Sequence, residues 1–210
     1  KDFTVSTHRG HAHYLAKGGD LKKMLAELHG KVTGCSKGMG GSMHLMDENA
    51  GVELSVPIVS SSIPLAVGSA LSFKLDKKPN VVMSFFGDAS VEEGVFHESV
   101  NYACLKQIPI IFVCENNLYS CFTHLNDRQP QRPLEDLGKA HNIKSYKIES
   151  QNVFEIIKNF KGIIDNCRKH NEPAFVVMDT YRWLQHCGVS RDDHLKYREE
   201  NELKKWLSYD

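Results

Sequence analysis

The sequence has no net charge of either sign. Its 210 residues include 26 Lys and Arg side chains and 26 Asp and Glu side chains, which cancel at pH 7. A chain without a basic excess is not expected to bind nucleic acid as its main role. No apolar run is long enough to span a membrane, and residues 1–3 do not begin a signal peptide. With 41% hydrophobic residues, the composition predicts one globular domain with its own core over residues 1–210 and no membrane partner.

Cys-x-x-Cys pairs are absent as well, although the chain has 6 cysteines. Several of these cysteines lie inside apolar patterns that are typical of buried strands and helices. The six are Cys35, Cys104, Cys114, Cys121, Cys167 and Cys187. The pattern indicates reduced thiols in the core and a cytoplasmic location of the bacterial type, or another reducing compartment.

The P-loop order Gly-x-x-x-x-Gly-Lys-Ser/Thr is missing from the glycine-rich stretch at residues 31–51, although Lys37 lies in it. Glycines let two backbones approach closely. We therefore interpret this stretch as a close-packed loop, as at a subunit contact, rather than as a phosphate cradle.

What the sequence does contain is a strand, a helix and a second strand between residues 81 and 119. Residues 81–86 and 110–114 are short, almost entirely apolar runs, which suit strands buried on both faces. Residues 91–107 carry a helical apolar stripe, and Ser90-Val91-Glu92-Glu93 has the spacing of a capping box. Such a unit predicts parallel strands with a right-handed connection.

Further elements extend this alternation into an α/β fold, a parallel sheet flanked by helices. The stretch 120–133 is expected to be a polar loop in which Arg128 and Arg132 are solvated surface charges. The charged run 191–194 is expected to be mobile surface until a substrate or partner arrives. Helices are predicted at 21–29 with Asp20 as the cap, 63–75, 134–141, 153–170 with Asn152 as the cap, and 199–207, and strands at 145–148 and 174–178.

Asp88 and Asn117 each follow one of the two central strands. Because the carboxyl ends of parallel strands meet at one edge of a sheet, we expect these side chains to lie side by side. Carboxylate, amide and carbonyl oxygens suit Mg²⁺ or Ca²⁺ rather than Zn²⁺, and Mg²⁺ completes its shell with phosphate oxygens. The expected ligand is a diphosphate, with amide donors from the helix that starts at Ser90. Alternatively, the Gly-Asp and Asn-Asn dipeptides are ordinary turn residues.

Gly87-Asp88, a helix and Asn116-Asn117 at this separation resemble the thiamin diphosphate signature. The surrounding chain is similar to the alpha subunit of the decarboxylating component of 2-oxo acid dehydrogenases of the pyruvate, branched-chain and acetoin types. The resemblance covers residues 6–206 and implies a thiamin diphosphate-binding fold with thiamin diphosphate and Mg²⁺ as cofactors. Its other motifs, in order, are Thr7-His8-Arg9-Gly10-His11, Gly40-Gly41-Ser42-Met43-His44 and Thr180-Tyr181-Arg182-Trp183.

The resemblance also implies residues that hold the metal and the diphosphate. Asp88, Asn117 and the main-chain carbonyl of Tyr119 match the metal ligands. Arg9 matches the arginine that clamps the diphosphate, for which a guanidinium fork is chemically apt. Ala89 and Ser90 follow Asp88 along the same turn and are expected to contact the cofactor.

Three more positions match residues near the reactive part of the cofactor. His8 stands where pyruvate-type members have a tyrosine, and Val59 would hydrogen-bond the aminopyrimidine through its main chain. His186 matches the histidine of the active-site loop, and we expect it to contact the cofactor and to be the catalytic side chain, as an acid, a base or an electrostatic helper. Cys187 replaces the regulated serine of mitochondrial members, which excludes phosphorylation there.

The implied activity is oxidative decarboxylation of a small 2-oxo acid and transfer of the acyl group to a lipoyl-bearing acyltransferase. In this family a separate beta subunit supplies the carboxylate that activates the aminopyrimidine, so the resemblance implies an α2β2 heterotetramer. Relatives also carry an N-terminal helical segment that this sequence lacks. Two alternatives remain: a thiamin-dependent enzyme that cleaves acetoin or transfers an aldehyde, and a non-catalytic scaffold subunit. Pro57 and Ala89 motivate the scaffold, since pyruvate-type members usually have Gly at both positions.

Overall fold

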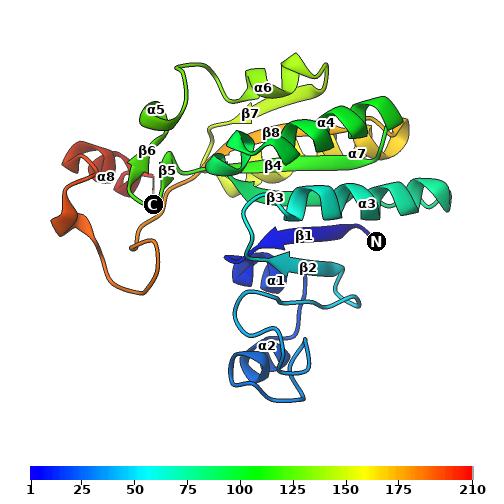
Figure 1. Ribbon diagram of the computed structural model, residues 1–210, viewed down its shortest axis with the longest axis horizontal. Coiled ribbons are helices and arrows are strands. Elements are labelled where there is room, and N and C mark those ends of the chain that lie inside the picture. Colours follow the sequence, from blue (N-terminus) through cyan, green and yellow to red (C-terminus); the bar gives the residue numbers. More distant parts are fainter. Residues whose placement is uncertain (210) are drawn as a thin grey trace.

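A sheet of six parallel strands organises the computed structural model, which describes residues 1–209. The spatial order of the strands is β2-β1-β3-β4-β8-β7, so the chain starts one strand in from an edge, adds β2 at that edge and then extends the sheet on the other side of β1 (Figure 1). This arrangement confirms the predicted parallel α/β sheet flanked by helices. The strands are β1 (Phe3–Thr7), β2 (Val52–Val56), β3 (Val82–Gly87), β4 (Ile110–Asn116), β7 (Lys144–Ile148) and β8 (Ala174–Asp179).

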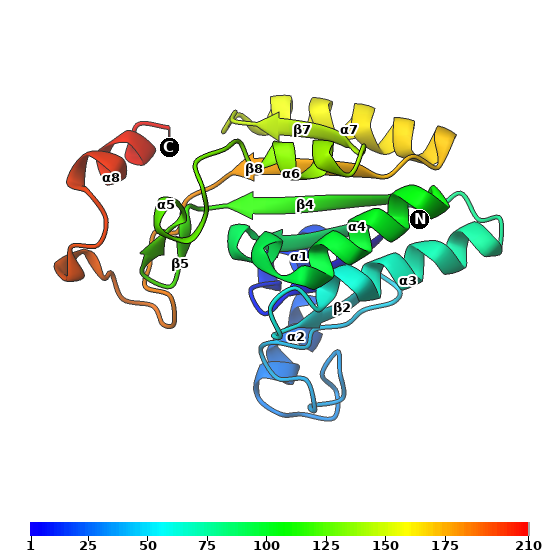
Figure 2. The same cartoon turned by 45° about the horizontal axis from the view of Figure 1, so that its top comes forward.

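Helices cover both faces of the sheet (Figure 2). On one face α3, α4 and α6 pack against β1, β3, β4 and β8 around Phe96, Phe112 and Phe175, and on the other face α7 packs through Ile163 and Cys167. None of the helices within residues 1–209 combines the length and apolar content that crossing a bilayer would require. The helices are α1 (His11–Ala16), α2 (Leu21–Leu28), α3 (Ser62–Leu75), α4 (Gly94–Lys106), α5 (Leu125–Arg128), α6 (Glu135–Ala140), α7 (Val153–His170) and α8 (Glu200–Leu207), with short 3₁₀ helices η1 (Asp88–Glu92) and η2 (Asp193–Leu195).

Two predicted helix caps are confirmed. The Asp20 carboxylate accepts hydrogen bonds from the backbone N–H groups of Lys22 and Lys23 at the start of α2. The Asn152 side-chain oxygen accepts hydrogen bonds from the backbone N–H groups of Phe154 and Glu155 at the start of α7. Each cap satisfies donors that a helix leaves without a partner.

The predicted capping box at Ser90 is wrong. Ser90 lies inside η1 and makes no side-chain cap, and α4 begins only at Gly94 after Glu93 in an extended conformation. The reason is that β3 runs one residue past Phe86, so the turn after it needs residues 88–92 before a regular helix can start.

Strands β1 and β2 were not predicted from the sequence. They contain polar residues such as Ser6 and Ser55, which the fold nevertheless buries between neighbouring strands and α1. The stretch after Tyr119 is also more ordered than predicted, because β5 (Tyr119–Ser120) and β6 (Thr123–His124) form a small antiparallel hairpin before α5.

The glycine-rich stretch is folded around one buried carboxylate. Glu27 on α2 has no solvent exposure, and its two oxygens accept hydrogen bonds from four backbone N–H groups of the loop. The donors are Ser36, Gly38, Gly40 and Gly41. The loop is therefore held in place by Glu27, and it lies away from the strand ends where the pocket forms (Figure 1).

Candidate active site

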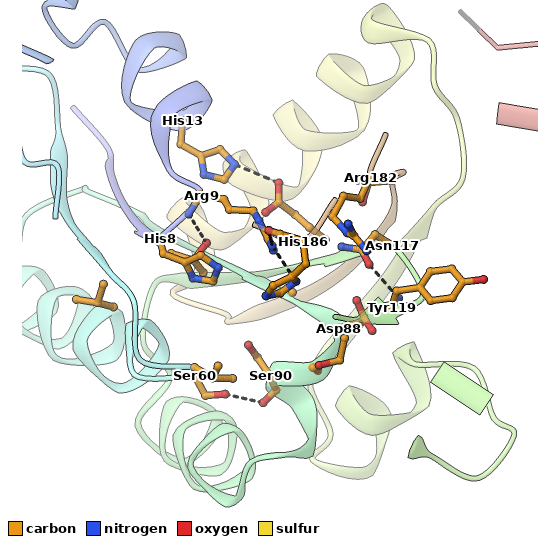
Figure 3. Close-up of a pocket in the computed structure, with 18 of the residues that line it drawn as sticks. His8, Arg9, His13, Ser60, Asp88, Ser90, Asn117, Tyr119, Arg182 and His186 are labelled. Carbon is orange, nitrogen blue, oxygen red and sulfur yellow. Dashed lines mark hydrogen bonds and ion pairs between the residues drawn. The ribbon is translucent and has the colours of Figure 1, made fainter. Parts of the chain in front are cut away.

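A pocket of about 350 Å³ opens at the carboxyl edge of the sheet. It is lined by the turns after β1, β2, β3, β4 and β8, which the parallel arrangement brings to the same edge (Figure 3). All the predicted site residues line this one pocket, namely His8, Arg9, Val59, Asp88, Ala89, Ser90, Asn117, Tyr119 and His186. Their roles as ligands and catalysts remain predictions.

Asp88 and Asn117 lie at the ends of neighbouring strands, as expected from the sequence. Gly87 of β3 pairs with Glu115 of β4, which sets the two turns side by side. Asp88 is only 1% exposed. A carboxylate buried to this degree needs hydrogen-bond donors or a positive partner, and Arg128 of α5 supplies both. The prediction that Arg128 is a solvated surface side chain is therefore wrong.

The two asparagines of the Asn-Asn pair have different environments. Asn116 is buried and donates to Asp179 Oδ1 at 3.1 Å, which ties the ends of β4 and β8 together. Asn117 lines the pocket, and its Oδ1 accepts a hydrogen bond from the Tyr119 backbone N–H at 2.9 Å. The same turn has Leu118 at a φ of 68°. Asn116 is thus structural, and Asn117 is the amide available to a ligand.

The turn after β3 is joined to the turn after β2. Ser60 donates its hydroxyl hydrogen to the Ser90 carbonyl oxygen at 2.9 Å (Figure 3). Val59, beside Ser60, is 54% exposed at the pocket wall. Ala89 is not among the residues of the described chain that have a positive φ. Alanine is therefore compatible with the backbone at this position, and the strain that would favour glycine is not present.

Arg9 holds the loop that carries His186. Its Nη2 donates to His186 Nδ1 at 3.0 Å and to the His186 carbonyl oxygen at 2.7 Å. Burial, followed by the charges of Arg9 and Arg182, lowers the pKa of His186 below its ordinary value. Burial and Arg9 lower the pKa of His8 in the same way. Both imidazoles are accordingly neutral near pH 7.

Three further residues of the pocket had no role predicted from the sequence. His13 Nε2 lies 3.1 Å from Glu115 Oε1, its Nδ1 lies 2.7 Å from Ser6 Oγ, and its ring stacks on Phe85. Arg182 donates to the Cys121 carbonyl oxygen at 2.9 Å. Their position in the sequence was the available signal, since Glu115 is the second-last residue of β4 and Arg182 follows β8, on the same edge as Asp88.

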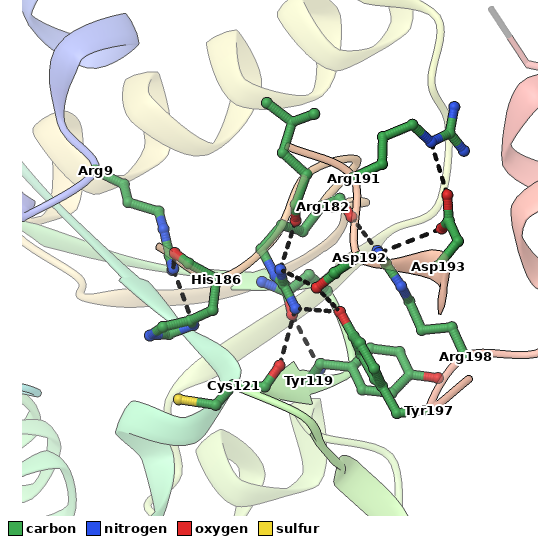
Figure 4. A network of polar contacts seen from close by, with 12 residues as sticks. Arg9, Tyr119, Cys121, Arg182, His186, Arg191, Asp192, Asp193, Tyr197 and Arg198 are labelled. Carbon is green, nitrogen blue, oxygen red and sulfur yellow. Dashed lines mark hydrogen bonds and ion pairs between the residues drawn. The ribbon is translucent and has the colours of Figure 1, made fainter. Parts of the chain in front are cut away.

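The loop that carries His186 is fixed by a buried ion-pair network (Figure 4). Asp192 is 1% exposed and accepts from Arg198 and from the Tyr197 hydroxyl, and Arg182 lies 3.6 Å away. Burial would raise the pKa of Asp192, but the hydrogen bond from Tyr197 and the two arginines lower it. The prediction that residues 191–194 are mobile surface is therefore wrong for Asp192, which is buried and paired.

The six cysteines differ in burial, and Cys35 and Cys104 are partly buried. Cys114 and Cys167 are buried as predicted, whereas Cys121 and Cys187 are exposed, so the prediction of core thiols is wrong for these two. All six are free thiols in the structure.

The sheet and the pocket at its edge define an α/β protein of the thiamin diphosphate-binding fold. Transketolase from Campylobacter jejuni subsp. jejuni has this fold in common with the chain, at a TM-score of 0.62 and 18% identity, with 86% of this chain and 29% of the transketolase covered. A family model described as "Dehydrogenase E1 component" matches residues 1–210. The chain belongs to this dehydrogenase family.

Relatives from two bacteria support the assignment. The chain is 34% identical over 207 residues to the alpha subunit of acetoin:2,6-dichlorophenolindophenol oxidoreductase from Bacillus subtilis, with 96% of this chain and 62% of the relative covered. It is 33% identical over 209 residues to the pyruvate dehydrogenase E1 component subunit alpha from Rickettsia typhi, with 100% and 63% covered. The chain thus spans less than two thirds of the length of these relatives.

Proposed function

We propose that the chain is the alpha subunit of a thiamin diphosphate-dependent dehydrogenase that oxidatively decarboxylates a small 2-oxo acid. The acyl group would pass to the lipoyl group of an acyltransferase, and a beta subunit would complete an α2β2 heterotetramer. The proposal is supported by membership of the Dehydrogenase E1 component family and by relatives named as pyruvate and acetoin alpha subunits. The observation that carries it is a single pocket with Asp88, Asn117 and Arg9 at its wall.

The residues present fit a magnesium diphosphate. Asp88, Asn117 and the Tyr119 carbonyl offer oxygen donors only, which are the ligands that Mg²⁺ prefers. No group of three or more His, Cys, Asp or Glu side chains within residues 1–209 offers a competing metal site. For the phosphate oxygens, Arg9 and Arg182 bring two guanidinium groups to the same pocket. The residues would therefore hold both the metal and the diphosphate.

Bound thiamin diphosphate would supply the carbon nucleophile and the electron sink for decarboxylation. The chain's own contribution would be to bind and orient. His186 is the proposed hydrogen-bond donor to the reacting oxygen, where it would stabilise developing negative charge, because Arg9 can only donate to Nδ1 and the neutral ring then carries its hydrogen on Nε2. The Asp192 network would hold this loop in position.

We further propose that the active site is shared with the beta subunit, which would supply the carboxylate that activates the aminopyrimidine. Residues 1–210 would form a single domain, in a reducing, cytoplasmic location of the bacterial type. Six free cysteines support the reducing location. An acetoin-cleaving activity is a second candidate, favoured by the name of the Bacillus subtilis relative.

The cofactor part of the proposal is tested by calorimetric titration of thiamin diphosphate in the presence of Mg²⁺. We expect saturable binding to the wild-type chain, loss of binding in Asp88→Ala, and unchanged binding in Asp76→Ala. Asp76 is a matched control because it is an exposed carboxylate at the end of α3, where it pairs only with Lys78. Absence of saturable binding in the wild-type chain combined with its beta subunit would overturn the proposal and favour a scaffold subunit.

The dependence of activity on a beta subunit is tested by carbon dioxide release from a panel of 2-oxo acids, with acetoin as a further substrate. We expect turnover only when the chain is combined with a beta subunit. Turnover at ordinary enzyme rates by the purified chain alone would show that it does not depend on a partner.

A further inference from the structure

Arg128 lies at the end of α5, and its side chain is only 10% exposed. It donates to Asp88 Oδ2 and to Glu92 Oε1, and its Nε donates to the Thr123 carbonyl oxygen at 3.2 Å. Gln129 Nε2 donates to the same Glu92 oxygen at 2.9 Å. The guanidinium therefore links the stretch 120–133 to η1, the turn that presents Asp88.

Arg128 contacts the Asp88 carboxylate without lining the pocket itself. Asp88 lines the pocket, whereas Arg128 and Glu92 do not. Arg128 uses Oδ2, and within residues 1–209 no hydrogen bond is made to Oδ1. Arg128 thus fixes the carboxylate and leaves an oxygen free for a ligand in the pocket.

Glu92 keeps the site attractive to a cation. Asp88, Arg128 and Glu92 together carry one net negative charge, because the guanidinium balances one of the two carboxylates. An uncompensated arginine beside Asp88 would repel a metal ion. The ion pair with Glu92 offsets this repulsion and holds the guanidinium in place.

We propose that Arg128 is a positioning residue for the metal site, which orients the Asp88 carboxylate and couples it to the stretch 120–133. The inference rests on the proposed function, in which Asp88 binds the metal of a magnesium diphosphate. Groups that hydrogen-bond a ligating carboxylate orient it, and their removal typically lowers metal affinity about 10- to 100-fold. Arg128 acts only through Asp88 and does not itself contact the metal.

The test is the affinity for Mn²⁺ in the presence of thiamin diphosphate, measured by electron paramagnetic resonance on the chain with its beta subunit and on the chain alone. We expect Arg128→Gln to weaken Mn²⁺ binding at least about tenfold. Arg132→Gln is the matched control, since Arg132 is exposed on the same stretch and, within residues 1–209, its side chain makes one hydrogen bond, to Gln129 Oε1 at 3.3 Å. This control should bind Mn²⁺ as the wild-type chain does.

Glu92→Gln is the second variant, in case Arg128→Gln does not fold. It retains the Arg128–Asp88 pair but removes the negative charge of Glu92, so the net negative charge beside the metal site is lost. Mn²⁺ binding should therefore weaken while the melting temperature in EDTA changes little. Thermal unfolding in EDTA separates a structural role from a positioning role for both variants.

A lower melting temperature with wild-type Mn²⁺ affinity would overturn the inference and leave Arg128 as a structural ion pair. Tighter Mn²⁺ binding in Arg128→Gln would also overturn it, because Arg128 would then compete with the metal for Asp88. Absence of Mn²⁺ binding in the wild-type chain, or binding that persists in Asp88→Ala, would overturn the proposed metal site itself and this inference with it.

Discussion

Arg9 donates to both Nδ1 and the carbonyl oxygen of His186, at 3.0 and 2.7 Å, across 177 residues of sequence. A guanidinium has no acceptor, so the Nδ1 atom must carry a lone pair. The neutral imidazole therefore has its hydrogen on Nε2. The loop after β1 thereby sets both the position and the tautomer of a histidine that lies beyond β8.

The first prediction concerns the titration of His186. Burial, Arg9 and Arg182 lower the pKa of His186, so the ring should be neutral at pH 7 and take up a proton only below the ordinary histidine range. In Arg9→Ala the pKa should rise, because one of the neighbouring positive charges is removed. Arg9→Lys is the matched control, because it keeps the charge and loses the guanidinium fork. Imidazole nitrogen NMR signals measure both the pKa and the tautomer.

A wild-type His186 that titrates at or above the ordinary histidine value would contradict this prediction. So would a neutral ring with its hydrogen on Nδ1. Assignment of the signal is checked by its loss in His186→Gln.

The second prediction concerns Glu27 and acid stability. Burial raises the pKa of Glu27, but four backbone hydrogen bonds outweigh it and hold the pKa below the ordinary value of 4.5. A carboxyl group with a lowered folded pKa stabilises the protein above its unfolded pKa, and this stabilisation is lost as the pH falls through the folded pKa. Glu27→Gln should destabilise the chain by about 2–3 kcal/mol at pH 7, since hydrogen bonds to a charged group are involved.

The difference between wild type and Glu27→Gln should shrink as the pH falls below about 4.5, the unfolded glutamate value. Urea unfolding at several pH values measures it. A difference that stays constant from pH 7 down to acid unfolding would show that the charge of Glu27 does not carry the stabilisation.

The third prediction concerns the close approach of Gly10 to the sheet. A Cβ atom on Gly10 would lie 2.8 Å from Ser55 Oγ, 2.9 Å from Ser6 Oγ and 3.0 Å from the Thr7 carbonyl oxygen, so Gly10→Ala must displace the two buried hydroxyls or the loop with Arg9. We expect a loss of about 1–3 kcal/mol in unfolding free energy, as for other overpacked sites. Cofactor binding should weaken as well, measured by the same titration as for Asp88→Ala.

Gly162→Ala is the control for the glycine change. Gly162 lies inside α7 with open space where a Cβ would be, so alanine should stabilise the chain by up to about 1 kcal/mol. Equal effects of the two substitutions on cofactor binding would contradict the role given to the Gly10 contact.

The fourth prediction concerns thiol reactivity. Cys121 and Cys187 are exposed, whereas Cys114 and Cys167 are buried, and burial raises the pKa of Cys167 to about 12. Iodoacetamide at pH 8 should therefore alkylate Cys121 and Cys187 first, as read by peptide mass spectrometry. Because Ser120 and His186 line the pocket beside these thiols, thiamin diphosphate with Mg²⁺ should slow the reaction. Fast alkylation of Cys114 or Cys167 would contradict the buried positions.

The sequence by itself determined the central strands, the parallel sheet and the placement of Asp88 and Asn117 at one edge. Runs such as Ile110-Ile111-Phe112-Val113 leave few alternatives to a doubly buried strand, and parallel strands must end on the same side. The helix caps at Asp20 and Asn152 could also be predicted from the local sequence, because each depends on one side chain and the two or three N–H groups that follow it.

Only the tertiary structure decided the partners of the charged residues. Arg128 and Asp192 lie in polar stretches that resemble solvated surface. Arg128 is buried because Asp88, 40 residues earlier, meets it, and Asp192 is buried because the chain folds back so that Tyr197 and Arg198 contact it. The start of α4 was also decided by the turn that carries Asp88 rather than by the Ser90 spacing. Local sequence preferences are weak compared with the cost of a buried, unpaired charge, so long-range pairing determined the details of the site.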